Sequence, residues 1–417
     1  FIRDFQQNGI FLNEIQGFMT DEDKARARAE ALAAIIAYRD NGCPQPAPLP
    51  AELVKEMLDW AACETIPDTY LGLLGEELDL EGTDPRRPAT LDPDRAAELP
   101  VAVIGCGESG VLAGIRLAQA GIPYTVFEKN AGPGGTWWEN TYPGARVDVA
   151  NHFYCYSFEP NNNWGHYFAE QPELQAYFAG LVAKHGLGEH VRWGTEVTAA
   201  AWDEDSGTWT LTTRTGDGSV STVSARAVIT AVGQLNRPHW PDLDGADGFR
   251  GPAFHSAAWD HSVDLTGRRV ALIGAGASGF QIAPAIAEKV AHLTVFQRTA
   301  QWMFPNPMYH DAVEGGVRWA LEHLPFYGRW YRFLLLWPGS DKGLEAARVD
   351  PDYPDQAYAV SELNALARQM FTAWITAQVG DDDELLAEVL PDYPATGKRT
   401  WAGSTRPMTA VCSFRAA

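Results

Sequence analysis

The chain has 417 residues, 46% of them hydrophobic, which is enough material for two or three globular domains. Its 54 acidic residues outnumber its 32 basic ones, and the formal net charge of −22 argues against a nucleic-acid partner. Because it has no apolar run long enough to span a bilayer, no signal peptide, and only five scattered cysteines without a CxxC pair, we expect a cytoplasmic protein without membrane contact, disulfide framework or metal site.

Residues 1–97 are predicted to be a helical N-terminal extension without a catalytic pattern. Thr20 and the three acidic residues that follow it mark the start of an alanine-rich helix, and Pro50 opens a second helix. Proline-rich spacers separate these helices from the rest of the chain. Two interpretations stay open: the extension is an oligomerisation module that makes a homodimer, or it is a helical lid on the main domain.

The first dinucleotide-binding pattern opens the region that we assign to residues 98–237. An apolar strand at 101–104 runs into a glycine-rich turn and then into a helix. The turn has the form GxGxxG, and its key residues are Gly105, Gly107, Ser109 and Gly110. Glycines at these places let the backbone approach a pyrophosphate at the helix N-terminus. Glu128 ends the next strand, 23 residues after Gly105, where a carboxylate can accept hydrogen bonds from an adenosine ribose.

The same arrangement occurs again in the region that we assign to residues 268–399. Its glycine-rich turn and the helix that follows contain Gly274, Gly276, Ser278, Gly279 and Gln281, which we place among the cofactor-binding residues. The second strand ends in the sequence TVFQR, which aligns with TVFEK in the first copy, so that Glu128 corresponds to Gln297. A carboxylate would repel a 2′-phosphate, whereas Arg298 and Thr299 can bind one. The first site therefore suits FAD and the second NADP, which predicts an α/β fold with two Rossmann-like dinucleotide-binding domains.

A loop rich in glycine and aromatic residues lies between the two patterns, at 134–148, with the sequence GGTWWENTYPGARVD. Its glycines and Pro143 suit a loop that runs close to a cofactor, and an aromatic side chain can form the wall of a site for a flat ring system. The cofactor-binding candidates in and after this loop are Thr136, Trp137, Arg146, Asp148 and Tyr154. Trp138 is expected to be an ordinary core residue.

The rest of the chain divides into three further parts. Alternating residues between Thr195 and Ala231 predict a β-meander with a returning strand. A linker at 238–267 follows, and residues 301–390 are predicted to be a helical insertion in the second dinucleotide-binding domain.

The linker carries the pattern Phe249-x-Gly251-x-x-x-His255-x-x-x-Trp259-Asp260, which resembles the signature of Baeyer–Villiger monooxygenases. The loop at 134–148 matches a longer signature of the same family, and Gly397-Lys398-Arg399 resembles a third element. The resemblance covers about residues 99–399. It implies an enzyme that uses FAD, NADPH and O2 to convert a ketone into an ester or lactone. The helical extension is similar to that of the 4-hydroxyacetophenone monooxygenase branch, which implies aryl ketones as substrates.

The resemblance also implies roles for individual residues. Arg399 would be the catalytic cation beside the developing oxyanion, and Asp148 would hold Arg399 in position. Lys398 would bind the 2′-phosphate, Arg146 would line the nicotinamide side, and Val197 would border the FAD adenine. The segment with Gly251, His255 and Trp259 would couple movements of the two domains, with His255 able to form a hydrogen bond across the domain boundary.

The resemblance stops after Arg399. Residues 400–417 form an atypical tail without any acidic residue, for which we expect a shifted reading frame or a premature end. Two alternatives to a Baeyer–Villiger enzyme therefore stay open. One is a flavin-dependent N- or S-hydroxylating monooxygenase of the same architecture, and the other is an inactive, truncated fragment that binds NADP.

Overall fold

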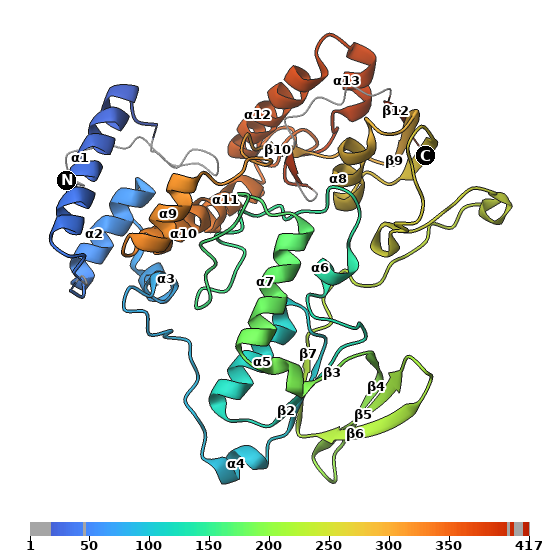
Figure 1. Ribbon diagram of the computed structural model, residues 1–417. Helices are drawn as coiled ribbons and strands as arrows, with labels where there is room; N and C mark the ends of the chain where they lie inside the picture. Colours follow the sequence, from blue (N-terminus) through green and yellow to red (C-terminus); the bar gives the residue numbers. More distant parts are fainter. Residues whose placement is uncertain (1–17, 45–46, 398–400, 404–411, 417) are drawn as a thin grey trace.

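The computed structural model describes residues 18–44, 47–397, 401–403 and 412–416 (Figure 1). The N-terminal part is helical, as predicted, with helices α1 (Asp21–Asp40), α2 (Ala51–Ala62), α3 (Leu71–Leu78) and α4 (Pro93–Ala97). Thr20 caps α1, because its hydroxyl oxygen accepts a hydrogen bond from the backbone N–H of Asp23 at 3.1 Å.

The first dinucleotide-binding unit is built on a parallel sheet in the order β3-β2-β1-β7. Its elements are β1 (Val101–Ile104), α5 (Glu108–Ala120), β2 (Tyr124–Phe127), α6 (Thr136–Glu139), α7 (Gln171–Lys184), β3 (Val191–Arg192) and β7 (Ala227–Thr230). Helices α5 and α7 lie next to each other and bury Val111, Ile115, Leu174 and Phe178 in one core with Val103 and Val126 of the sheet (Figure 1). This layer positions the turn after β1, where the first site was predicted.

The predicted meander is confirmed as an antiparallel sheet of β4 (Thr195–Asp203), β5 (Thr208–Thr215) and β6 (Val220–Ala225). Leu211 of β5 and Ala225 of β6 pack against Phe127 and Ala102 of the parallel sheet, which fixes one sheet on the other. The chain then returns as β7 beside β1, with Val103 opposite Ile229.

The second unit repeats the pattern with β8 (Arg269–Ile273), α8 (Ala277–Ile286) and β9 (His292–Gln297). These strands form a parallel sheet in the order β12-β9-β8, and a separate parallel pair joins β10 (Met303–Pro305) to β11 (Trp401–Gly403). Strands β11 and β12 (Cys412–Ala416) come from the segment predicted to be an atypical tail, so its described residues pair with strands of the second unit.

The helical insertion contains α9 (Gly315–His323), α10 (Tyr327–Leu336), α11 (Asp341–Leu344), α12 (Glu362–Val379) and α13 (Asp383–Val389). Short 3-10 helices are η2 (Asp68–Tyr70), η3 (Leu187–His190), η4 (Ala246–Gly248), η5 (Ser256–Ala258), η6 (Trp337–Gly339) and η7 (Glu345–Ala347). Helices α2 and α3 pack on α10 and η6 through Leu58, Leu74, Phe333 and Trp337. No helix in the described ranges combines the length and apolarity needed to cross a membrane.

Candidate dinucleotide-binding sites

The first glycine turn has the geometry that a close approach of backbone requires. Gly105 has φ +102°, in the region that favours glycine. A Cβ atom on Gly110 would lie 1.9 Å from the carbonyl oxygen of Gly105, so the start of α5 can pack this closely on the turn only without a side chain. Ser109, also predicted for this site, is exposed on the first turn of α5. The N–H groups at this helix start can bind an anion.

Glu128 contacts this turn and holds its backbone through a hydrogen bond to Cys106. The side chain is only 3% exposed, its Oε2 accepts a hydrogen bond from the N–H of Cys106 at 2.7 Å, and its Oε1 accepts one from Asn130 at 2.8 Å. Burial, and then the charge of Glu128, raises the pKa of the Cys106 thiol to about 12, so this cysteine stays protonated. Each carboxylate oxygen keeps a further lone pair, which suits the predicted contact with a ribose hydroxyl.

The aromatic loop crosses the glycine turn. A Cβ atom on Gly135 would lie 2.9 Å from the Cα of Gly107, and Thr136 is exposed at the start of α6 beside this crossing. Trp137 is buried and donates its indole N–H to the hydroxyl of Tyr154 at 3.3 Å. The expectation for Trp138 was wrong, because its side chain is 37% exposed and lies over Gly132.

Glu108 is a residue that the sequence analysis missed at this site. It is the first residue of α5, and its Oε2 accepts a hydrogen bond from the hydroxyl of Tyr154 at 3.1 Å. Burial, followed by the charge of Glu108, raises the pKa of Tyr154, which therefore remains a neutral donor. The sequence did offer a signal for this residue, because Glu108 is a carboxylate in the middle of the GxGxxG turn.

The second glycine turn reproduces the geometry of the first. Gly274 has φ +103°, and a Cβ atom on Gly279 would lie 2.1 Å from the carbonyl oxygen of Gly274. Around Gly276, in contrast, a Cβ atom would meet no atom of the described residues within 4 Å, which leaves space there for a ligand. Ser278 is half-buried on the first turn of α8.

The end of β9 carries the cation that the sequence predicted. Arg298 is exposed, and no partner for its guanidinium is seen in the part of the chain that the structure describes. Gln297 donates its amide N–H to the carbonyl oxygen of Glu388 at 2.8 Å, and the carbonyl of the half-buried Thr299 accepts one from Gln301. Arg298 is therefore available for an anionic group directly after Gln297, the uncharged residue that corresponds to Glu128 of the first copy.

Gln281 joins the two units instead of pointing only toward a ligand. Its Oε1 accepts hydrogen bonds from the hydroxyl of Tyr142 at 3.0 Å and from the N–H of Arg146 at 3.4 Å. Its Nε2 donates to the carbonyl of Arg146 at 2.9 Å and to Asp148 Oδ1 at 3.3 Å. A Cβ atom on Gly144 would lie 2.6 Å from the carbonyl oxygen of Gln281, so the Tyr-Pro-Gly loop presses directly on α8.

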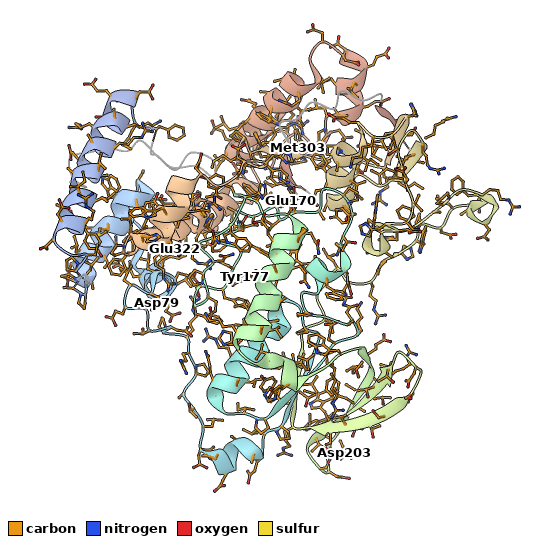
Figure 2. The ribbon with its side chains drawn as sticks, in the orientation of Figure 1. Asp79, Glu170, Tyr177, Asp203, Met303 and Glu322 are labelled. Atoms are coloured by element: carbon orange, nitrogen blue, oxygen red, sulfur yellow. The ribbon has the colours of Figure 1, made fainter. Side chains whose placement is uncertain are left out.

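Arg146 and Asp148, two further predicted residues, lie at this junction. The guanidinium of Arg146 is buried, donates to the carbonyl of Tyr309 at 2.8 Å, and pairs with Glu170 at 2.7 Å. Glu170, labelled in Figure 2, is the residue that precedes α7. Asp148 Oδ1 accepts a hydrogen bond from the Tyr309 hydroxyl at 2.9 Å. These groups hold the guanidinium of Arg146 in place, and its role on the nicotinamide side stays a prediction.

The linker segment is anchored on the second unit. Trp259 is half-buried against the core that α8 and β9 share with Tyr142 and Ala145. A Cβ atom on Gly251 would lie 2.7 Å from the ring of Phe249. The expected cross-boundary bond of His255 is not observed within the described ranges, because its Nδ1 accepts from the nearby N–H of Ala257 at 3.1 Å. His261, missed by the sequence analysis, instead bonds Thr141 of the aromatic loop at 2.8 Å.

Lys398 and Arg399 lie outside the described residues, but the segment that leads to them is fixed by α12. Arg368 donates to the carbonyl of Tyr393 at 2.7 Å, and the fully buried Asn364 donates to the hydroxyl of Thr396 at 2.9 Å. Val197, the remaining predicted residue, packs beside Phe127 next to the first sheet.

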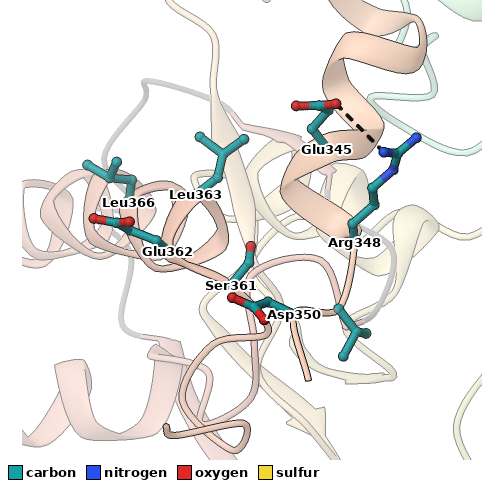
Figure 3. Close-up of a pocket in the computed structure, with 8 residues that line it drawn as sticks. Glu345, Arg348, Asp350, Ser361, Glu362, Leu363 and Leu366 are labelled. Atoms are coloured by element: carbon teal, nitrogen blue, oxygen red, sulfur yellow. Dashed lines mark ion pairs between the residues drawn. The ribbon is translucent and has the colours of Figure 1, made fainter. Parts of the chain in front are cut away.

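A hollow on the helical insertion is lined by none of the predicted site residues that the structure describes (Figure 3). It is lined by Glu345, Arg348, Val349, Asp350, Ser361, Glu362, Leu363 and Leu366. Its three carboxylates and single arginine do not suit a dinucleotide. Among the described residues, no group of three or more His, Cys, Asp or Glu side chains could hold a metal ion.

Comparison with known proteins gives a consistent result. The family model described as flavin-binding monooxygenase-like matches residues 98–312. An uncharacterised monooxygenase of Sinorhizobium fredii is 36% identical over 387 residues, which are 92% of this chain and 57% of that protein. A Baeyer–Villiger monooxygenase of Streptomyces coelicolor is 38% identical over 306 residues, which are 73% of this chain and 55% of that protein. The chain thus spans about half the length of the curated relatives it matches.

Solved structures agree with these relatives. Oxidised steroid monooxygenase bound to NADP superposes with a TM-score of 0.61 at 30% identity, over 76% of this chain and 65% of that one. Cyclohexanone monooxygenase from Rhodococcus sp. Phi1 bound to NADP+ superposes with a TM-score of 0.61 at 29% identity, over 77% of this chain and 65% of that one.

Proposed function

Because the chain belongs to the flavin-binding monooxygenase-like family, we propose that it binds FAD at the first glycine turn and NADPH at the second, as a Baeyer–Villiger monooxygenase. Its reaction inserts one oxygen atom of O2 next to the carbonyl of an aryl or cyclic ketone and gives an ester or lactone. The observation that carries this proposal is the repeated glycine turn, in which Gly110 and Gly279 contact the carbonyls of Gly105 and Gly274 in the same way.

The two turns differ in charge at the place that distinguishes the cofactors. Buried Glu128 suits the free ribose hydroxyls of FAD, whereas its counterpart Gln297 carries no charge and is followed by exposed Arg298, which suits the 2′-phosphate of NADPH. Both helix starts offer backbone N–H groups to a diphosphate. The domain limits at 98–237 and 268–399, a cytoplasmic location and a homodimer through the N-terminal helices remain predictions.

The chain's own residues would bind the two cofactors, orient the reacting groups and exclude water from the site. Bound FAD would supply the electron transfer and oxygen activation that side chains cannot provide. Trp137 and Tyr154 would form the wall of the flavin site, and Lys398 would add a second cation for the 2′-phosphate. Asp148, held by Tyr309 and Gln281, would orient Arg399 toward the oxygen atom on which negative charge develops.

The direct test uses the purified chain supplied with FAD. We expect a visible flavin absorption band that stays with the protein, and NADPH oxidation that an aryl ketone stimulates. Mass spectrometry should find a product heavier by one oxygen atom. Preferential oxidation of amines or sulfides would identify the N- or S-hydroxylating alternative, and NADP+ binding without flavin would identify an inactive fragment.

Arg298→Gln provides the matched control for the cofactor assignment. Hydrogen bonds to charged groups contribute about 1.5–3 kcal/mol, so the variant should raise the KM for NADPH roughly tenfold or more. The KM for NADH should change less than about twofold, since NADH lacks the 2′-phosphate. Equal effects on the two nucleotides would contradict the assignment of the second site to NADPH.

A further inference from the structure

The segment after β10 belongs to the second unit in sequence but packs into the first. The backbone N–H of Val313 donates to the carbonyl of Gly165 at 2.9 Å, and that of Tyr167 donates to Asp311 at 3.1 Å. Tyr309 and Val313 are both buried in the core that α5 and α7 form with the first sheet. This crossing brings one side chain of the segment into contact with both the aromatic loop of the first unit and α8 of the second.

Tyr309 is that side chain. It is 4% exposed, and its hydroxyl donates to Asp148 Oδ1 at 2.9 Å while accepting from Gln281 Nε2 at 3.1 Å. Asp148 ends the aromatic loop of the first unit, and Gln281 lies on α8 of the second. Its ring lies against Phe168, with the ring centres 5.2 Å apart, and its backbone carbonyl accepts from Arg146, so the hydroxyl has little freedom to move.

We infer that Tyr309 is a positioning residue that couples the two cofactor sites, by transmitting the position of α8 to Asp148 through its hydroxyl group, whose hydrogen bonds of 3.1 and 2.9 Å are shorter than the direct bond of 3.3 Å between Gln281 and Asp148. When a dinucleotide binds at the N-terminus of α8 and shifts this helix, Gln281 moves with it. The Tyr309 hydroxyl, which accepts a hydrogen bond from Gln281, then changes the hydrogen bond that it donates to Asp148. The coupling is reciprocal. If binding of FAD at the aromatic loop changes the affinity of α8 for NADP+ by some factor, binding of NADP+ must change the affinity for FAD by the same factor. This inference rests on the proposed binding of FAD and NADPH.

Tyr167 offers a closely matched control. It is also a buried tyrosine, its hydroxyl donates to the carboxylate of Glu314 at 2.8 Å, and it spans the same two segments of the chain. Its hydroxyl contacts neither Gln281 nor Asp148 among the described residues. Tyr167→Phe therefore removes the same chemical group from the same core without touching the junction.

The first measurement is a double-mutant cycle on the cofactor-free chain. Tyr309→Phe, Asp148→Ala and the double variant are unfolded in urea, and their unfolding equilibrium constants are compared. If the Tyr309 hydroxyl bonds the Asp148 carboxylate, the unfolding equilibrium constant of the double variant should differ at least about fivefold from the value expected if the two single effects were independent. Additivity within about twofold would overturn the inference, whatever cofactors the chain binds.

The second measurement is the Kd for NADP+ with and without saturating FAD. We expect FAD to change this Kd at least about fivefold in the unaltered chain and in Tyr167→Phe, and less than about twofold in Tyr309→Phe. Unchanged coupling in Tyr309→Phe, or equal loss in both variants, contradicts the inference. Failure of the unaltered chain to bind FAD contradicts the proposed function instead, and the first measurement then still decides whether Tyr309 holds Asp148.

Discussion

At the scale of single residues, the His152 imidazole shows how burial without hydrogen-bond partners among the described residues determines whether a side chain is charged. Its side chain is 5% exposed, and neither ring nitrogen has a hydrogen-bond partner among the described residues. The ring packs edge-on against Tyr331 at 5.3 Å. Burial lowers the pKa of His152 from 6.5 to about 4, so the folded protein keeps this imidazole neutral.

This shift predicts a loss of stability in acid. Between pH 6.5 and about 4 the unfolded chain binds a proton at His152 and the folded chain does not, so the free energy of unfolding falls as pH decreases. The shift corresponds to at most about 3 kcal/mol. Urea unfolding at pH 7 and pH 4.5 should show a smaller pH-dependent loss for His152→Phe than for the unaltered chain. Equal losses in both proteins would show that His152 is not protonated on unfolding.

The residues of the glycine turns could be predicted from sequence because their function is local. Gly110 and Gly279 are required by close contacts with the carbonyls of Gly105 and Gly274, each within six residues of chain, and spacing alone reveals such contacts. The junction could not be predicted in the same way. Gln281 contacts Arg146 across 135 residues, and Tyr309 contacts Asp148 across 161, so only the fold brings these side chains together.

At the scale of elements, the N-terminal helices and the helical insertion depend on each other. Trp337 is 5% exposed at the end of α10, stacks on Phe333, and donates its indole N–H to Glu64 at 2.8 Å. Tyr70 packs edge-on against the same indole. Two segments more than 260 residues apart in sequence thus share one small core.

Trp337→Ala should therefore release the N-terminal helices. Truncating a buried tryptophan costs about 3–5 kcal/mol, so we expect proteases to cleave α2 and α3 faster and the unfolding temperature to fall. The Kd for NADP+ should change less than about twofold, since no cofactor-site residue contacts Trp337. Trp319→Ala changes a side chain on α9 that is 49% exposed, and it should leave the cleavage rate, the unfolding temperature and the Kd for NADP+ nearly unchanged. If proteases cleave α2 and α3 of Trp337→Ala no faster than in the unaltered chain, this core does not hold the N-terminal extension in place.

Elements were predictable where their pattern was long. Alternation over β4 to β6 and capped apolar runs indicated the meander and the helices correctly. Strands β10 and β11 have three residues each, too few for a period to appear, and pairing with a distant partner alone defines them. The expectation of a shifted reading frame or a premature end at residues 400–417 stays a prediction.

At the scale of the whole molecule, the net charge opposes the cofactors that the site attracts. A charge of −22 repels an anionic dinucleotide at long range, whereas Arg298 and the N-terminus of α8 act only nearby. The Debye length falls from about 30 Å at 0.01 M salt to about 8 Å at 0.15 M, so salt removes the long-range repulsion first.

The association rate constant for NADP+ should therefore rise several-fold when NaCl increases from about 10 to about 150 mM, because screening weakens the repulsion by the whole surface. Stopped-flow fluorescence measures this rate separately from dissociation. In Arg298→Gln the rise with salt should be steeper, since the local attraction that salt also screens has been removed. A rate that falls with salt in the unaltered chain would show instead that the field at the second glycine turn is positive over distances beyond the Debye length, despite the acidic surface around it.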